Sequence, residues 1–188
     1  MLKWFFAVPI IALLILGFGL IANNTTNKSE IQSPGVKGNI ETYFCVDFKP
    51  ANGEWISLGC QHNVFTNAGR NHVKGLLGGT ITTDMHTKYL ALGNGTAPTA
   101  TSTSLNNEVT GCGLNRKLGD YYSLGDGWWE VNTTFTYTCS GSLLVNTTGA
   151  FNQASAGTFF AGGEITPVTF TTNGDQLRLR HNNTISEA

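Results

Sequence analysis

The stretch from Cys112 to Cys139, CGLNRKLGDYYSLGDGWWEVNTTFTYTC, most constrains what this chain folds into. Gly125-Asp126 lies at its centre, and such residues between two alternating segments are typical of a two-residue β-hairpin turn. With that turn, Cys112 faces Cys139 across the hairpin. The apolar residues of both strands then share one face, on which Tyr122 lies opposite Trp129. The other members of that face are Leu114, Leu118, Val131, Phe135 and Tyr137. Turn, face and cysteines agree on one register, so we predict a hairpin closed by a Cys112–Cys139 disulfide, with a bulge expected in strands this long.

The segment from Thr42 to Cys60 has a second hairpin pattern, with Asn52-Gly53 as its turn. A two-residue turn there places Cys45 opposite Cys60, but it puts the apolar residues of the two strands out of step. A shift of one residue restores the apolar pairing and separates the cysteines, whereas a bulge or a longer loop satisfies both. Four cysteines allow three pairings, and because Cys112–Cys139 is better supported, we expect Cys45–Cys60 as the second disulfide.

The composition excludes several classes of protein. Charged residues make up only 12% of the 188 residues, whereas about 25% is usual, and Gly, Thr and Asn are abundant. Such a composition is typical of an all-β protein with many turns. The net charge of −1 provides no electrostatic footprint for nucleic acid, so we expect no direct nucleic-acid binding. The histidines are scattered and the sequence contains no C-x-x-C, so no zinc site and no cofactor are predicted.

The N-terminal residues predict export. Residues 4–22, WFFAVPIIALLILGFGLIA, form an uncharged apolar run that nearly spans a bilayer as a helix. Residues 1–22 are therefore either a retained membrane anchor or a cleaved secretory signal, and Leu20 fits the small-residue cleavage pattern poorly. In either case we expect the chain from Asn23 onward to lie outside the cytoplasm, in agreement with the even number of cysteines. Residues 23–41 are polar and predict a flexible linker to a domain of residues 42–188.

Asn-x-Ser/Thr sequons recur through the chain and are candidate N-glycosylation sites. They lie at Asn23, Asn24, Asn27, Asn94, Asn132, Asn146 and Asn182. In a chain this rich in Asn and Thr some sequons arise by chance, so the sequence leaves their occupancy open.

The pattern of residues 42–188 predicts an antiparallel, jelly-roll-like β-sandwich of eight or nine strands with one short helix, preceded by the N-terminal hydrophobic helix. The helix is expected from Thr66 to Gly79, with an apolar stripe of Val73, Leu76 and Leu77 that excludes His72.

A third hairpin turn is predicted at Asn173-Gly174. That turn places Phe170 opposite Leu177 and Val168 opposite Leu179, so the register again agrees with the apolar face.

Three pieces of the chain carry a resemblance to a known family. They are NAGRNHVKGLLGG, then YLALGNGTAPTATSTSLNNEV followed by Arg116, and finally AFNQASAGTFFAGGEITPVTFTTNGDQL. In this order, over residues 65–179, they resemble small β-sandwich structural proteins of tailed-phage and proviral gene sets. The resemblance implies a virion or tail-associated component without catalytic residues. The membrane-type N-terminus, the four cysteines and the sequons depart from that family and favour an exported, archaeal-type surface or virion relative.

No nucleophile elbow, metalloprotease motif, P-loop or haem motif is present, so we predict that the protein is not an enzyme. Three functional hypotheses follow. The first is a self-assembling filament subunit in which Ile31 to Thr42 adds as a strand to a neighbour's sheet edge. The second is a virion surface protein. The third is an anchored adhesin or lectin-like module, in which Trp128 points outward and either stacks on a glycan or packs on a neighbouring loop.

Overall fold

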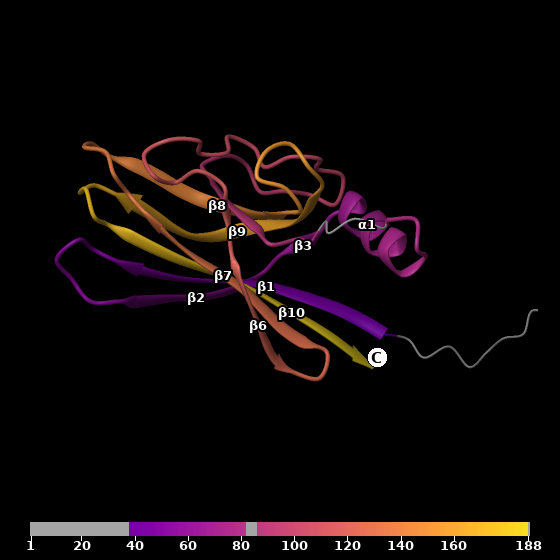
Figure 1. Ribbon diagram of the computed structural model, residues 1–188. Coiled ribbons are helices and arrows are strands. Elements are labelled where there is room, and N and C mark those ends of the chain that lie inside the picture. Colours follow the sequence, from indigo (N-terminus) through magenta and orange to yellow (C-terminus); the bar gives the residue numbers. More distant parts are fainter. Residues whose placement is uncertain (1–37, 82–85, 188) are drawn as a thin grey trace, which may run out of the picture. The chain divides into compact units, whose positions relative to one another are not determined.

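The strands of the structure are β1 Gly38–Lys49, β2 Ile56–His62, β3 Val64–Phe65, β4 Tyr89–Gly93, β5 Lys117–Leu118, β6 Asp120–Gly125, β7 Trp128–Thr136, β8 Leu143–Phe151, β9 Phe159–Phe170 and β10 Gln176–Glu187, and the helix is α1 Asn67–Leu77. A computed structural model describes residues 38–81 and 86–187 (Figure 1). One sheet has the strand order β2-β1-β10-β7-β6 and the other β3-β9-β8-β4-β5. The predicted antiparallel β-sandwich with one short helix is therefore confirmed, with ten strands among the described residues. The segment of residues 1–22, the linker up to residue 37 and the sequons at Asn23, Asn24 and Asn27 lie outside them.

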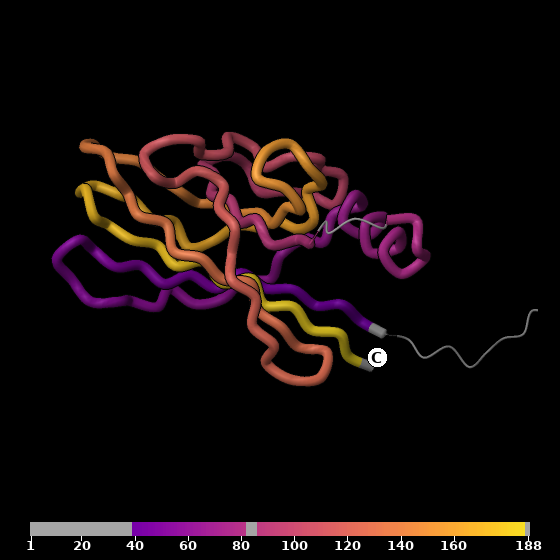
Figure 2. The backbone as a smooth tube through the Cα atoms, in the orientation of Figure 1, coloured from indigo at the N-terminus to yellow at the C-terminus, as the bar shows by residue number. Residues whose placement is uncertain are grey.

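The strand pairing is nested. The first strand pairs with the last, and each further pair lies nearer to the middle of the chain: β1 with β10, β3 with β9, β4 with β8, and β6 with β7. β10 also pairs with β7, which brings the tip of the β6–β7 hairpin beside the end of β10 in one sheet (Figure 2). The middle of the chain and the ends of the domain thereby meet.

The core lies between the two sheets and is built from alternating residues of facing strands. Phe135 and Leu177 are opposite each other on β7 and β10, and both are fully buried. Val145 and Phe170 cover them from β8 and β9 of the other sheet. Burial of one such side chain contributes about 1.5–3 kcal/mol relative to leaving it exposed.

Both predicted disulfides, Cys45–Cys60 and Cys112–Cys139, are present. The conflict in the first hairpin is resolved by a bulge and a longer loop. Cys45 pairs with Cys60, the register shifts beyond Val46, and Gly59 takes a φ of +89° beside the extra residue Leu58. Two disulfides indicate an oxidising, extracellular-type environment. Among the described residues no helix is long and apolar enough to cross a membrane.

The register predicted for the central hairpin is wrong by one residue. The turn is Asp126-Gly127, and Tyr122 lies opposite Glu130 instead of Trp129. Gly127 takes a φ of +67°, and a Cβ there would lie 2.5 Å from the carbonyl oxygen of Ile185, so the turn places glycine where β10 approaches most closely.

The first half of that hairpin is also shorter than predicted. Leu118 belongs to β5 in the other sheet and is exposed, because the chain crosses between the sheets just before β6. The Cys112–Cys139 disulfide still forms because the N–H of Thr138 donates to the carbonyl oxygen of Cys112 at 2.9 Å, where Cys112 itself has a φ of +56°.

The hairpin predicted at Asn173-Gly174 is wrong, because β9 and β10 lie in different sheets. Phe170 and Leu177 are both buried, but they face the core from opposite sides. Asp175 holds this crossing turn. Its carboxylate accepts hydrogen bonds from the N–H groups of Thr171, Thr172 and Ala51, each at 2.9 Å.

Helix α1 is confirmed, with Thr66 as its N-cap, but its buried face differs from the prediction. Gly69, His72 and Gly75 face inward, whereas Leu77 is 85% exposed. A Cβ at Gly69 would lie 2.2 Å from the carbonyl oxygen of Phe160, so Gly69 sets the close approach of the helix to β9. Of the predicted apolar stripe, Val73 is half-buried and packs against the core, whereas Leu76 and Leu77 are exposed, because the close backbone contact at Gly69 turns the glycine face of the helix inward.

Candidate assembly surface

One end of the first sheet runs past the strands of the second (Figure 1). We call this part, residues 38–41, 120–130 and 184–187, the projecting end. Burial changes abruptly along its strands. On β10, Asn183 is buried and Ile185 is 51% exposed, and on β1, Phe44 is buried and Ile40 is 37% exposed. The projecting end therefore leaves apolar side chains without a covering layer in the described part of the chain.

The outermost strand of the projecting end is β6. All six of its residues are exposed, and among the described residues it pairs only with β7. It contains no Lys and no Pro, two residues that natural proteins commonly place on exposed edges, and it carries Tyr121, Tyr122 and Leu124. Its one charged residue is Asp120, and its register against β7 shifts between Ser123 and Gly125. An open, partly apolar edge strand is a ready template for pairing with another chain.

The three other sheet edges are protected. β3 and β5 contain two residues each. β2 is longer, but Thr166 of β9 covers it. The Thr166 hydroxyl donates to the carbonyl oxygen of Leu58 at 3.1 Å and accepts from the Gln61 side chain at 3.4 Å. β6 is thus the least guarded edge in the described part of the chain.

The outward backbone groups of β6 follow from the strand repeat. The N–H of Gly119, directly before β6, donates to the carbonyl oxygen of Lys88 at 2.7 Å, on the side away from β7. Because backbone groups alternate in direction along a strand, the N–H groups of Tyr121 and Ser123 point to the same outer side. These are the donors that an added strand would use.

The outer face of the projecting end carries an aromatic pair. Trp128 is 47% exposed and Tyr122 is 46% exposed. Tyr122 lies opposite Glu130 and Trp128 lies two residues before it, so the two rings are diagonal neighbours on one face. Thr184 flanks Trp128 on β10. Trp129, on the opposite face, packs against the core.

The inner face borders two hollows next to β6. The larger, of about 800 Å³, is lined among others by Tyr89, Leu118 and Gln153. The smaller, of about 400 Å³, is lined by residues that include Leu76 and Trp129. The two share His86, Lys88 and Tyr121, and the Lys88 ammonium lies 5.5 Å from the centre of the Tyr121 ring.

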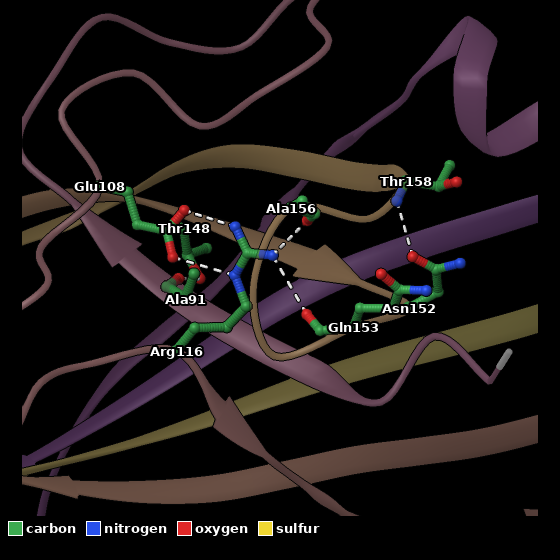
Figure 3. A network of polar contacts seen from close by, with 8 residues as sticks. All are labelled: Ala91, Glu108, Arg116, Thr148, Asn152, Gln153, Ala156 and Thr158. Atoms are coloured by element: carbon green, nitrogen blue, oxygen red, sulfur yellow. Dashed lines mark hydrogen bonds and ion pairs between the residues drawn. The ribbon is translucent and has the colours of Figure 1, made fainter.

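Arg116, one of the residues that carry the family resemblance, links two loops through its side chain (Figure 3). Its guanidinium makes two hydrogen bonds to the Glu108 carboxylate, at 2.9 and 2.6 Å, and donates to the carbonyl oxygens of Gln153 and Ala156 at 3.1 and 2.7 Å. The guanidinium also stacks on Phe151, 3.4 Å from the ring centre. Arg116 thus ties the long loop before β5 to the β8–β9 turn, and its hydrogen-bonding groups are engaged.

The sequons within the described residues fall into two groups. Asn94 is exposed in the loop after β4. Asn132, Asn146 and Asn182 are half-buried in strands, where glycan attachment needs the side-chain nitrogen to be accessible. That nitrogen donates to Glu130 at 2.7 Å in Asn132 and to the Cys45 sulfur at 3.3 Å in Asn182.

Two buried ionisable groups have shifted pKa values. Burial lowers the pKa of His181 to about 3, and its Nε2 has no hydrogen-bond partner among the described residues. For Asp175, burial raises the pKa, but the backbone hydrogen bonds from Thr171, Thr172 and Ala51 outweigh it and lower the pKa below 3.8. Both side chains lie in the interior, where His181 packs in the core and Asp175 holds the turn between β9 and β10.

Within the described ranges, no group of three or more His, Cys, Asp or Glu side chains is arranged to hold a metal ion. No protein-family model matches the chain, and no curated protein sequence matches it significantly. The interpretation of the projecting end as an assembly surface is therefore supported by its geometry alone. Sequence reasoning missed β6 as an edge because Tyr122 and Leu118 fit the apolar alternation of a buried strand.

Proposed function

We propose that this protein is a non-enzymatic, exported structural subunit that assembles into a surface filament. The observation that carries the proposal is that β6, at the projecting end, is the least guarded edge among the described residues, with outward N–H groups and exposed aromatic residues. A monomer has no use for such an edge, which favours aggregation, whereas a subunit that pairs with its own copies requires one.

Further features support export and assembly. The two disulfides stabilise a domain outside the cytoplasm, which is either secreted or anchored through residues 4–22. The nested pairing of β1–β10, β3–β9 and β4–β8 supports the jelly-roll-like refinement of the fold. The resemblance to phage and proviral β-sandwich proteins supports an assembling subunit of a filament or, alternatively, a virion.

Density-gradient fractionation of the producing culture tests the proposal. The protein is followed together with nuclease-resistant nucleic acid and electron microscopy of each fraction. Banding with nucleic-acid-free fibres is the expected result. Banding with protected nucleic acid would assign the protein to a virion instead, and recovery only as monomers in the membrane or the medium would overturn assembly.

The aromatic pair on the outer face favours a second function, a lectin-like module. Trp128 and Tyr122 present two neighbouring rings, beside the carboxylate of Glu130, to a glycan. The test is glycan binding by Trp128→Ala, with Trp55→Ala as the matched control, since Trp55 is a 37%-exposed tryptophan just before β2. Loss of binding in W128A alone supports the module, and unchanged binding in both variants contradicts it.

A further inference from the structure

The β6 edge requires an occupant, and the chain itself contains a candidate. Ile31 to Thr42 is the segment expected to add to a neighbour, but β1 begins at Gly38 and pairs with β10 as far as Glu187. Residues 38–42 are therefore already used within their own sheet. The part that remains for addition is residues 31–37, IQSPGVK.

We infer that residues 31–37 of one copy add as a strand to the β6 edge of a second copy. This inference rests on the proposed filament and names its contact. Pro34 is compatible with it, because an added strand is itself an edge and tolerates one residue without an N–H.

The segment cannot reach β6 of its own chain in a pairing arrangement. β1 and β6 are separated by β10 and β7, so their axes lie about 14 Å apart. Seven extended residues span at most about 24 Å, so the crossing alone uses about four of them. About three residues of this segment would remain, too few to pair along β6, so pairing within one chain would need residues before Ile31. Addition to another copy has no such limit.

Chemistry favours the same pairing. The one charged residue of the segment 31–37 is Lys37, and the β6–β7 hairpin carries Asp120, Asp126 and Glu130. Side chains of an added strand alternate between the two faces of the sheet. One set would lie over the hollow lined by Tyr121 and Trp129, which suits Ile31 or Val36, and the other beside the outer aromatic pair.

The contact joins different surfaces of the two copies, because the arm of one subunit binds the hairpin of the next. Such a head-to-tail contact does not close on itself unless the rotation between copies closes a ring. Repetition therefore produces an open filament, with one free arm at one end and one free β6 edge at the other.

The first test uses Ser123→Pro and its matched control Ser123→Ala in the full chain. S123P removes the outward N–H at the centre of β6 but leaves the side facing β7, whereas S123A keeps that N–H. We expect S123P to reduce the fibre fraction about tenfold or more, because the ladder of the added strand is broken, and S123A to assemble like the wild type. Thermal unfolding of both variants checks that the hairpin still folds.

The second test is a disulfide cross-link that needs no loss of function. Chains carrying Ser33→Cys are mixed with chains carrying Ser123→Cys, and Ser142→Cys, exposed just before β8, replaces the latter as a control. We expect cross-linked dimers only with S123C. If S123P assembles normally and S33C does not cross-link to S123C, this contact is refuted and the filament stands. If the wild type forms no fibres, the filament itself is refuted.

Discussion

A fall in pH from 7 to 5 is expected to destabilise the fold by about 2 kcal/mol through one side chain, His181. The ring is 1% exposed and lies between β1 and β7, where its neighbours are Phe44, stacked at 4.6 Å between ring centres, and Val131. Phe160 covers it edge-on from the other sheet at 6.3 Å. A charged imidazolium in these surroundings would be desolvated without a compensating carboxylate.

The direction follows from the two pKa values. The unfolded chain binds a proton at His181 below its ordinary pKa of 6.5, whereas the folded chain does so only near pH 3. Between these values the unfolded state holds more protons, so stability is complete above pH 6.5 and decreases as the pH falls. The same arithmetic gives about 2 kcal/mol at pH 5 and about 3 kcal/mol at pH 4.

The assay is urea unfolding at pH 7.5, 6 and 5 with both disulfides intact, followed by tryptophan fluorescence. The wild-type midpoint is expected to fall by about 1 M between pH 7.5 and 5, since 1 M urea corresponds to about 1–3 kcal/mol. His181→Leu, of similar volume and without a titrating group, is expected to lose most of this dependence. His62→Gln, at an exposed histidine on β2, is the matched control and should behave like the wild type. Parallel loss of stability in wild type and H181L would refute the reasoning.

Three further outcomes are expected. Arg116→Ala should destabilise the fold by about 3 kcal/mol or more in the same assay, because it leaves the Glu108 carboxylate and two carbonyl groups unpaired. Arg116→Lys should recover part of the lost stability. A change below about 1 kcal/mol in R116A would contradict the structural role of this side chain. Asp175→Asn should lower the free energy of unfolding by about 1–3 kcal/mol at pH 7. The difference from the wild type should shrink only below about pH 4, because the pKa of the carboxyl is lowered in the folded state, so its contribution is complete above 3.8 and is lost as the pH falls through the lowered value. A difference that already shrinks at pH 6 would count against this reasoning. In a host that N-glycosylates, peptide mass mapping should find glycan at Asn94 and none at Asn146 or Asn182, and the reverse pattern would contradict the burial argument.

Alternation, turn residues and cysteines were sufficient to predict the sandwich and the Cys112–Cys139 disulfide, because each of these signals is local, and Cys45–Cys60 followed as the remaining pair. They were not sufficient to predict which strands share a sheet. Phe170 and Leu177 face the core equally well from one hairpin or from two opposed sheets, since the alternation is the same in both. The crossing turn is held by contacts with distant segments, among them the hydrogen bond from the N–H of Ala51 to the Asp175 carboxylate and that from the N–H of Gly174 to the carbonyl oxygen of Tyr137. Such a choice is decided by tertiary contacts that a linear pattern does not contain.

The candidate surface was hidden for a related reason. The alternation predicts Tyr122 on the buried face of the hairpin, because hydrophobicity predicts burial wherever a covering layer exists. The observed register, shifted by one residue, places Tyr121 on that face instead, and Tyr121 is still 53% exposed. Here the opposing sheet ends before it covers β6. The sequence of β6 does not show how far that sheet extends. Trp128 was different: its outward orientation needed only the two-residue repeat and the buried partner Trp129.

The positions of the two disulfides make sense in the proposed filament. Tension would enter a subunit through the arm before β1 and leave through β6, so it would pass across β1, β10, β7 and β6 of one sheet without crossing the core. Cys45–Cys60 ties β1 to β2 close to the entry of that path, and Cys112–Cys139 ties the segment after β7 to the loop that leads to β5 and β6. These cross-links limit how far the chain extends once hydrogen bonds along the path break, because Cys45 holds β1 to β2 and Cys112–Cys139 closes the loop that contains β5, β6 and β7. Reduction should therefore shorten fibres under shear, measured by electron microscopy, more than it lowers the urea midpoint of the sandwich at rest, and equal effects would contradict a subunit that transmits tension.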